Sequence, residues 1–358
     1  MKQARLQAAI ARWLHQQWLR RGWFAWTLTP FALLTACYVW FKRRWYSQGF
    51  SQTYRAPVPV IIVGNLYVGG TGKTPVVIAL VKQLKALGWH PGLISRGYGI
   101  KIGPRPRVGQ DPIDPAFFGD EPALLAEKTC APIAVHPLRR LACEALLAAH
   151  PEVDLIVSDD GLQHLALARD VEIVVQDARA VGNGWLLPAG PLRESASRLC
   201  AVDLVVTRQT LAARTGGSND QACAQSTHRP ELQFWLQIIQ FHSLNSKINI
   251  SGDEFISFSM NKSISVISAI SEPDRFFSSL KQLGLHCQST VALPDHHPLG
   301  ANVFADQDAD IILITEKDAV KCRLLQDPRI WVAATEAVMS DTQWVEKISA
   351  QLDGTAQK

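Results

Sequence analysis

The chain has 358 residues, of which 47% are hydrophobic and 19% charged, so it is long enough for one large domain or two smaller ones. Its formal net charge of +4 hides an asymmetry, because the first acidic residue is Asp111 and 16 of the 36 Lys and Arg residues precede it. A basic N-terminal part of this kind can bind anionic lipid, nucleic acid or phosphorylated ligands. The seven cysteines are widely spaced and form no CxxC pair, which argues against a structural zinc site and indicates a reduced, cytosol-facing protein.

An uncharged stretch runs from Gly22 to Phe41, with arginines before it and Lys-Arg-Arg after it. Six of the 11 tryptophans lie in the first 45 residues, and an indole ring favours the headgroup level of a bilayer. The stretch is long enough to span a ~30 Å hydrocarbon layer, but Pro30 interrupts it and the positive charge on both flanks selects no orientation. Together with a basic amphipathic helix expected over residues 2–21, it predicts an anchor that lies in the cytoplasmic leaflet. A true span and a buried core helix are the alternatives.

Beyond this segment, apolar runs alternate with helical patterns. Buried strands are expected at residues 57–66, 153–158, 171–176 and 203–207. Helices are expected at residues 75–87, 123–127 and 139–149. Strands that alternate with helices predict a parallel sheet covered by helices on both faces.

Polar residues become more frequent over 209–262, where residues 216–219 predict a surface loop. Regular patterns then return. Strands are expected at residues 265–270, 286–293 and 310–314, and helices at residues 273–283 and 317–325. This second run of elements predicts a smaller α/β lobe.

A glycine-rich segment follows the first expected strand, and residues 63–75 read VGNLYVGGTGKTP. The strict phosphate-loop pattern requires a glycine five residues before the glycine of GKT, but Tyr67 occupies that position. The physical requirements are still met, because glycines let backbone N–H groups turn toward phosphate oxygens, and the threonine hydroxyl can bind Mg²⁺. Pro75 then begins a helix whose N-terminal dipole faces the anion. We therefore predict that the phosphates of ATP, with Mg²⁺, bind at Gly69, Gly70, Thr71, Gly72, Lys73 and Thr74.

Two adjacent acids end the next buried strand, where residues 155–161 read LIVSDDG. In phosphate-loop proteins, an acid at the end of the neighbouring strand holds the metal directly or through water. Asp159 and Asp160 are therefore candidate metal ligands. A plain turn is the alternative for these residues.

A phosphate loop alone does not separate a kinase from a GTPase or a transport ATPase. A kinase must also deprotonate an acceptor hydroxyl. A carboxylate from residues 119–122 (GDEP) and an imidazole from residues 295–298 (DHHP) could share this proton transfer if the fold brings them together. Helix capping and plain surface exposure are the alternatives. Arg193, within LLPAGPLRE, is a candidate for neutralising charge on the transferred phosphoryl group, or else a solvated cation.

Seven segments, in this order, resemble the tetraacyldisaccharide 4′-kinase family. They are VGNLYVGGTGKTP (63–75), SRGYG (95–99), FGDEP (118–122), SDDGLQH (158–164), LLPAGPLRE (186–194), LPDHHP (293–298) and TEKDAVK (315–321). The resemblance implies transfer of the γ-phosphoryl group of ATP to the 4′-hydroxyl of a tetraacylated glucosamine disaccharide 1-phosphate, a step of lipid A biosynthesis. It also implies a location at the cytoplasmic face of the bacterial inner membrane. The partners would be this glycolipid and the membrane surface, with no nucleic acid and no obligate protein partner.

The same resemblance implies a role for individual residues. Asp120 would be the base for the sugar hydroxyl, assisted by His296, and Arg193 would neutralise developing charge. Gln163 and His164 would lie near the nucleotide. Thr74 would bind Mg²⁺, and the carboxylates that would organise the metal and the catalytic pair are Glu121, Asp159, Asp160 and Asp295.

We therefore expect a membrane-associated helical segment at 1–50, a P-loop kinase domain at 51–230 and a smaller C-terminal α/β lobe at 231–358. Two regions depart from the family pattern. Residues 268–272 (SAISE) stand where a glycine-containing strand end is expected, and residues 209–262 match no part of the pattern.

Two other functions remain open. The first is a membrane-associated P-loop ATPase or GTPase that acts as an assembly factor. Residues 315–318 (TEKD) resemble the guanine-reading motif of GTPases, but Glu316 replaces its Asn, which weakens the guanine reading. The second is a non-catalytic nucleotide-binding component of an envelope complex.

Overall fold

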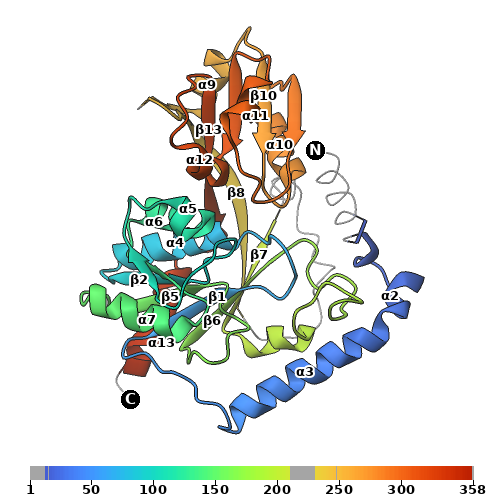
Figure 1. Ribbon diagram of the computed structural model, residues 1–358, viewed down its shortest axis with the longest axis vertical. Helices are drawn as coiled ribbons and strands as arrows, with labels where there is room; N and C mark the ends of the chain where they lie inside the picture. Colours follow the sequence, from blue (N-terminus) through green and yellow to red (C-terminus); the bar gives the residue numbers. More distant parts are fainter. Residues whose placement is uncertain (1–12, 15, 210–229, 247, 357–358) are drawn as a thin grey trace.

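A computed structural model describes residues 13–14, 16–209, 230–246 and 248–356 of the chain. One sheet runs through two lobes, in the strand order β11-β10-β12-β13-β8-β7-β6-β1-β5-β2-β4-β3, with β9 paired to β8 (Figure 1). We call the part around β1 the first lobe and the part around β10 the second lobe.

The first lobe has the expected alternation of parallel strands and helices. Its strands are β1 (Val60–Gly64), β2 (Pro91–Ser95), β3 (Arg107–Gly109), β4 (Ile133–Val135), β5 (Leu155–Asp159), β6 (Val171–Asp177) and β7 (Leu204–Arg208). Its helices are α4 (Lys73–Ala86), α5 (Pro115–Phe118), α6 (Asp120–Thr129), α7 (Arg139–Ala149) and the 3₁₀ helix η1 (Ala196–Ala201). Sequence patterns missed β2, β3 and β4, because β2 begins with Pro-Gly and the other two have only three residues each.

Both faces of the first lobe are covered, as expected for a parallel sheet. Ile61 and Val63 of β1 pack into the core formed with α4 and α6. Val60 and Ile62, on the opposite face, pack with α7. All five residues of β1 are buried, which explains why this strand has an unbroken apolar sequence.

The second lobe is a smaller parallel sheet with helices on both faces. Its strands are β9 (Asn249–Ser251), β10 (Ile264–Ser268), β11 (Ser289–Ala292) and β12 (Ile311–Thr315). Its helices are α9 (Gly252–Phe258), α10 (Pro273–Gln282), α11 (Ala301–Ala305) and α12 (Glu316–Cys322). These elements confirm the smaller α/β lobe that the sequence predicts.

Two long strands, β8 (Glu231–Ser243) and β13 (Ile330–Met339), join the lobes (Figure 1). β8 is parallel to β7 and antiparallel to β13, and β13 is parallel to β12. The strands of the second lobe therefore run opposite to those of the first, so the carboxyl ends of both sets face each other. Ligands of α/β proteins bind at carboxyl ends, and this topology predicts a site between the lobes.

The last helix, α13 (Trp344–Ala356), returns to the first lobe. Trp344, Ile348 and Leu352 lie in the same core as α4, and Trp89 Nε1 donates a hydrogen bond to Ser349 Oγ at 2.9 Å. The division at residue 230 stays a prediction, but by its packing α13 belongs with the first lobe.

The uncharged N-terminal stretch forms two helices, α2 (Trp23–Thr27) and α3 (Thr29–Ser47), which meet at Leu28. Pro30 lies in the first turn of α3, where its missing N–H leaves no helical hydrogen bond unmade. Within the described residues, no helix combines the length and the apolar character needed to cross a membrane. Most of the amphipathic helix expected at 2–21, and all of the loop expected at 216–219, lie outside the described residues.

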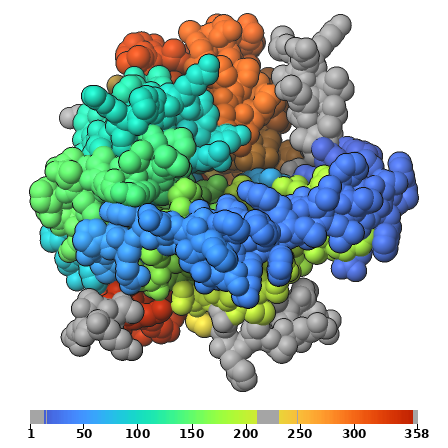
Figure 2. Space-filling view, turned by 60° about the horizontal axis from the view of Figure 1, so that its bottom comes forward, coloured from blue at the N-terminus to red at the C-terminus, as the bar shows by residue number. Residues whose placement is uncertain are grey.

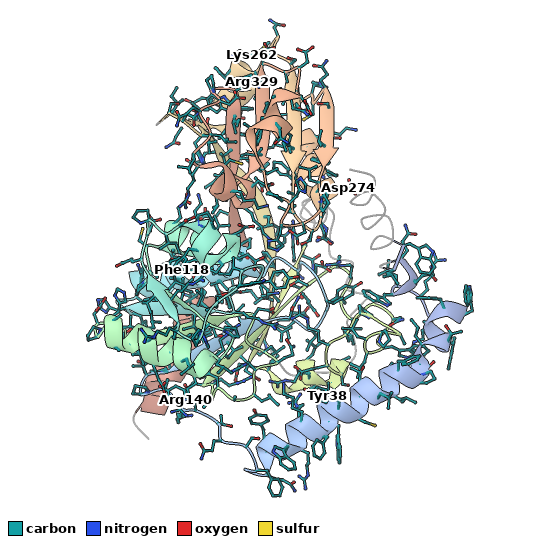
Figure 3. The ribbon with its side chains drawn as sticks, in the orientation of Figure 1. Tyr38, Phe118, Arg140, Lys262, Asp274 and Arg329 are labelled. Carbon is teal, nitrogen blue, oxygen red and sulfur yellow. The ribbon has the colours of Figure 1, made fainter. Side chains whose placement is uncertain are left out.

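Helices α2 and α3 lie on the surface of the first lobe, as the blue band in Figure 2 shows. Only Ala25 and Ala32 of the two helices are buried, so the alternative of a buried core helix is wrong. Tyr38, labelled at α3 in Figure 3, is one of the exposed aromatic residues of this helix. More than half of the residue's surface is exposed at Trp23, Trp26, Phe31, Leu33, Leu34, Tyr38, Trp40 and Phe41. We call these eight residues the apolar N-terminal surface.

Candidate active site

The glycine-rich loop leaves the end of β1 and is shaped from inside by Asn65. This side chain is fully buried, and its Nδ2 donates to the carbonyl oxygens of Tyr67 at 2.7 Å and Gly69 at 3.1 Å and to Thr71 Oγ1 at 3.2 Å. Our sequence analysis assigned no role to Asn65. A polar residue directly after a buried strand was the available signal.

Tyr67, which replaces a glycine of the strict pattern, is only 2% exposed. The guanidinium of Arg179 lies 4.4 Å from the centroid of its ring and donates a hydrogen bond to the carbonyl oxygen of Gly70 at 2.7 Å. A bulky side chain at this position therefore packs beneath the loop and supports it through Arg179. The departure from the strict pattern leaves the space above the loop open.

The loop ends at Gly72, whose φ of 88° lies in the left-handed region that favours glycine. Gly72 is the N-cap of α4, and no side chain caps this helix. The N–H groups of its first turn are therefore available to an anion, with the positive end of the helix dipole behind them.

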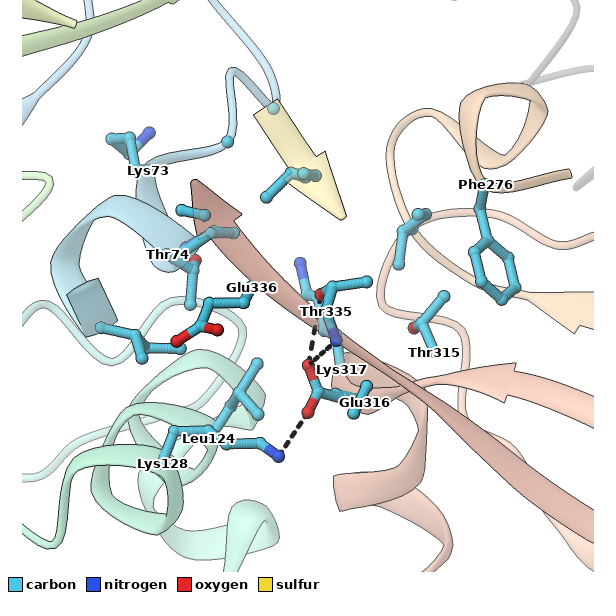
Figure 4. A pocket seen from close by; sticks show the side chains of 18 of the residues that line it. Lys73, Thr74, Leu124, Lys128, Phe276, Thr315, Glu316, Lys317, Thr335 and Glu336 are labelled. Carbon is cyan, nitrogen blue, oxygen red and sulfur yellow. Dashed lines mark hydrogen bonds and ion pairs between the residues drawn. The ribbon is translucent and has the colours of Figure 1, made fainter. Parts of the chain in front are cut away.

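A cavity of about 310 Å³ lies between the lobes, a size typical of small-molecule sites. Figure 4 shows Lys73 and Thr74 at the start of α4, across from Thr315, Lys317 and Thr335 of the opposite wall. The phosphate loop thus opens into the space toward which both sets of strands point.

The two acids after β5 lie beside the loop, because β5 pairs with β1 in a register that places Asp159 opposite Val63. Asp160 Oδ1 is 3.3 Å from Lys73 Nζ and 3.1 Å from Arg193 NH1. Burial would raise the pKa of Asp160, but Lys73 and Arg193 outweigh it and hold the pKa below its usual value. Arg193 NH1 also lies 3.4 Å from Gln163 Oε1. The structure thus joins four of the expected residues into one charged group.

Asp159 differs from its neighbour because it is buried and its Oδ1 has no hydrogen-bond partner among the described residues. Burial and the nearby carboxylate of Glu121 raise the pKa of Asp159 to about 7. The carboxylates of Asp159 and Glu121 together form a site suited to a hard cation such as Mg²⁺. This ion typically binds one or two carboxylates and completes its coordination shell with phosphate and water. In the described part of the chain, no three His, Cys, Asp or Glu side chains form a complete metal site.

The raised pKa of Asp159 has a consequence for stability. The folded protein retains this proton at pH values where the unfolded chain has lost it, so the stability from this group declines as the pH rises from about 4 to about 7. We therefore compare the free energy of unfolding of Asp159→Asn with that of the wild type at pH 5 and at pH 8. From pH 5 to pH 8 this difference should shift in favour of the variant by on the order of 1–3 kcal/mol. Urea denaturation with EDTA and without nucleotide measures this difference, and an equal difference at both pH values would contradict it.

A second group joins the two lobes near the same cavity. His296, in the loop after β11, has its Nδ1 3.2 Å from Oδ2 of Asp120, in the first turn of α6. Asp295 accepts a hydrogen bond from Ser271 Oγ at 2.7 Å. Burial would raise the pKa of Asp295, but Lys317 and this hydrogen bond lower it. The expected carboxylate–imidazole pair is therefore present, and each lobe supplies one member.

Lys317 is the residue of this group that sequence analysis missed, although it lies in the quoted segment TEKDAVK. Its Nζ is 2.9 Å from Glu121 Oε1, 3.4 Å from Asp295 Oδ1 and 3.5 Å from His296 Nε2. Burial would lower the pKa of Lys317, but Glu121 and Asp295 outweigh it and raise the pKa. Lys317 therefore supplies a fixed positive charge between the carboxylates of both lobes.

The other acids of TEKDAVK have structural partners. Glu316 pairs with Lys128 and accepts hydrogen bonds from the backbone N–H and hydroxyl of Thr335, as the dashed lines in Figure 4 show. Asp318 is fully buried and accepts a hydrogen bond from the backbone N–H of Ala269. Because both carboxylates are engaged in this way, the segment does not present the acceptors that read guanine, which disfavours the GTPase alternative.

His164 is not among the residues that line the cavity of the phosphate loop. It lines a second cavity with Tyr54, Arg55 and Arg140. Burial and surrounding cations, first among them Arg139, lower the pKa of His164 to about 4. Its expected place near the nucleotide stays a prediction.

A parallel sheet whose central strand leads through an uncapped glycine loop into a helix, with a lysine and paired carboxylates beside it, defines a P-loop nucleotide-binding protein. Over residues 24–353 the chain matches the protein family Tetraacyldisaccharide-1-P 4'-kinase. Because this match covers most of its length, the chain belongs to the tetraacyldisaccharide-1-P 4'-kinase family.

Relatives from several bacteria agree with this assignment. The tetraacyldisaccharide 4'-kinase of Bordetella parapertussis is 48% identical over 344 residues, which are 96% of this chain and 97% of the relative. That of Herminiimonas arsenicoxydans is 40% identical and covers 97% of each chain. The crystal structure of LpxK from Aquifex aeolicus in complex with ATP matches with a TM-score of 0.75 at 24% identity, covering 92% of this chain and 99% of that chain. The expected P-loop α/β fold is confirmed.

Proposed function

We propose that this chain transfers the γ-phosphoryl group of ATP to the 4′-hydroxyl of a tetraacyldisaccharide 1-phosphate, the lipid A precursor for which its family is named. The observation that carries this proposal is the pair Asp120–His296, which joins the two lobes and adjoins Glu121 and Lys317 of the cavity wall. A nucleotide switch has no need for a base beside its phosphate site, whereas a kinase must deprotonate its acceptor.

The phosphate loop and the charged group beside it hold the triphosphate in this proposal. Lys73 moves its charge from Asp160 to the phosphate oxygens, and the first-turn N–H groups of α4 add hydrogen bonds. Thr74, Glu121 and Asp159, with Asp160 nearby, would hold Mg²⁺, which neutralises charge on the phosphate oxygens when bound.

The chemical step needs a nucleophile, a base and charge compensation. The sugar oxygen attacks the γ-phosphorus as the bond to ADP breaks, and Asp120 takes the proton of the hydroxyl. His296 orients Asp120 and shares the proton, and Asp295 and Lys317 hold the imidazole from its other side. Arg193, held by Asp160 and Gln163, neutralises charge that develops on the transferred group.

A lipid-kinase assay tests the proposal. The full-length protein in detergent micelles, with γ-labelled ATP and the tetraacyldisaccharide 1-phosphate, should form a labelled phospholipid in an amount that depends on added lipid. ATP hydrolysis without lipid stimulation, and without any labelled lipid, would instead favour the assembly-factor alternative.

We further propose that the apolar N-terminal surface lies in the cytoplasmic leaflet of the bacterial inner membrane. Exposed aromatic and aliphatic side chains concentrated on two helices, followed by Lys42, Arg43 and Arg44, fit an interface with anionic lipid. Lys42 and Arg43 also tie α3 to the first lobe, through the carbonyl oxygen of Gln163 at 3.2 Å and the carboxylate of Glu194 at 3.0 Å. An anchor held in this way would keep the active site close to a substrate that resides in the bilayer.

Charged substitutions on the exposed face of α3 should release the protein from membranes. We expect Phe31→Glu, Leu34→Glu and Tyr38→Glu together to lower binding to anionic vesicles by more than about tenfold, because each removes exposed apolar area that the lipid would cover. Deletion of residues 1–45 should have the same effect. Flotation of vesicles measures binding, and unchanged ATP affinity shows that the first lobe is intact. Undiminished flotation of the triple variant would remove the anchor proposal.

A further inference from the structure

One arginine that lines the cavity, Arg208, is largely buried. It is the last residue of β7, and its side chain is 18% exposed. Among the described residues it donates no side-chain hydrogen bond, and its nearest carboxylate oxygen, on Glu272, is 4.0 Å away. A guanidinium offers five N–H donors in a planar fork and is rarely left without acceptors when it is largely buried.

The surroundings of Arg208 carry surplus positive charge. Glu272 is closer to two other arginines, Arg275 at 2.9 Å and Arg179 at 3.2 Å. The other carboxylate, Asp177, pairs with Arg179 at 2.6 Å and with Arg275 at 3.4 Å. Three guanidinium groups thus share two carboxylates. Burial and Arg275 lower the pKa of Arg208 to about 10, which agrees with a cation that lacks a full counter-charge.

Arg208 also lies beside Gly72, at the end of the phosphate loop. A β-carbon at Gly72 would come within 3.4 Å of Arg208 Cδ, and both residues line the cavity between the lobes. The register of β6 and β7, which places Asp177 opposite Arg208, brings this side chain to the same carboxyl edge as the loop. A ligand that lies on the loop therefore passes directly beside a guanidinium whose charge is only partly compensated.

We propose that Arg208 binds the β- and γ-phosphate oxygens of the nucleotide and is a phosphate ligand of this kinase in addition to Lys73. This inference rests on the proposed ATP-dependent function. Phosphate oxygens match both needs of the site, since they carry the missing negative charge and accept the paired N–H bonds of an arginine fork. A carboxylate or amide ligand would supply less charge and would have no reason to lie on an uncapped helix N-terminus.

Titration calorimetry of the full-length protein with ATP, ADP and AMP, in detergent and without lipid, tests this assignment. We expect Arg208→Met to weaken ATP and ADP binding by about 10- to 100-fold, the range for a charge-assisted contact, and AMP binding by less than about twofold. Lys82→Met is the matched control, because Lys82 is a cation of the same cavity on an exposed part of α4, and it should leave all three affinities within about twofold.

Each outcome decides between the two proposals. If the wild type binds ATP and Arg208→Met binds it equally well, the phosphate role of Arg208 is wrong while the proposed function stands. An equal loss for all three nucleotides would also overturn it, because the contact would then not be with the β- and γ-phosphates. A wild type that fails to bind ATP overturns the proposed function itself. If Arg208→Met does not fold, as judged by its melting temperature, Arg208→Gln is measured in its place with the same expectations.

Discussion

Replacing Asp120 with asparagine should lower kcat by about 10³-fold while the Kd for ATP stays within about twofold of the wild type. Asparagine keeps the size of the side chain and its contact with His296, whose Nδ1 lies 3.2 Å from the carboxylate, but it cannot accept the proton of the sugar hydroxyl. General bases contribute about 10²- to 10⁴-fold to turnover, and in the proposed function ATP is held by the phosphate loop, of which Asp120, in the first turn of α6, is no part. Single-turnover phosphorylation of the lipid, with a separate ATP titration, measures both quantities.

The chain offers a close control in Asp253. It occupies the first turn of α9 and is followed by a glutamate, as Asp120 is in α6, but it is exposed on the second lobe. Asp253→Asn should leave kcat unchanged. Turnover of Asp120→Asn close to that of the wild type would remove Asp120 from the chemistry.

Replacing Lys73 with methionine should reduce kcat/KM for ATP by about 10²- to 10³-fold. Without nucleotide, Lys73 Nζ lies 3.3 Å from Asp160, and in the proposed function this charge moves to the phosphates. Methionine keeps the length of the side chain but removes the charge at a point where α4 supplies only backbone N–H groups. Asp160 keeps Arg193 as a partner at 3.1 Å, so the melting temperature should change little.

Initial rates at varied ATP concentration measure this effect, and thermal melting shows whether the fold is kept. Lys82→Met, on the same helix, should behave as the wild type does. A Lys73→Met enzyme with unchanged kcat/KM would place the phosphates of ATP elsewhere in the cavity and would contradict the reading of the glycine loop.

Much of the first lobe could be predicted because its signals are local. The apolar run of β1, the glycines and the first turn of α4 are contiguous in sequence, and backbone geometry alone joins them. The neighbouring Asp159 followed from the rule that parallel strands end at one edge. By contrast, the sequence shows Tyr67 only as a departure from the strict phosphate-loop pattern. Nothing near it in sequence reveals that the guanidinium of Arg179 lies over its ring.

The long strands that join the lobes could not be predicted from local sequence patterns. β8 alternates exposed and buried residues over thirteen positions, yet it lies in a region for which the sequence suggested no element. Its partners are β7 on one side and β13, about a hundred residues later, on the other. Pairings at such separations depend on packing of the whole sheet and leave no local pattern.

Residue types and their spacing establish the chemistry available to this protein: a phosphate loop, paired carboxylates, an imidazole and an apolar, basic N-terminus. Which of these groups meet depends on how the distant parts of the chain pack. Asp120 and His296 are 176 positions apart and come together because β8 and β13 are antiparallel, which turns the carboxyl edge of the second lobe toward that of the first. The same arrangement brings Lys317 between the carboxylates. The pairing of β6 with β7, within the first lobe, brings Arg208 beside the loop. Local chemistry is encoded in residue type and spacing, whereas long-range contact follows from the direction in which distant strands pair.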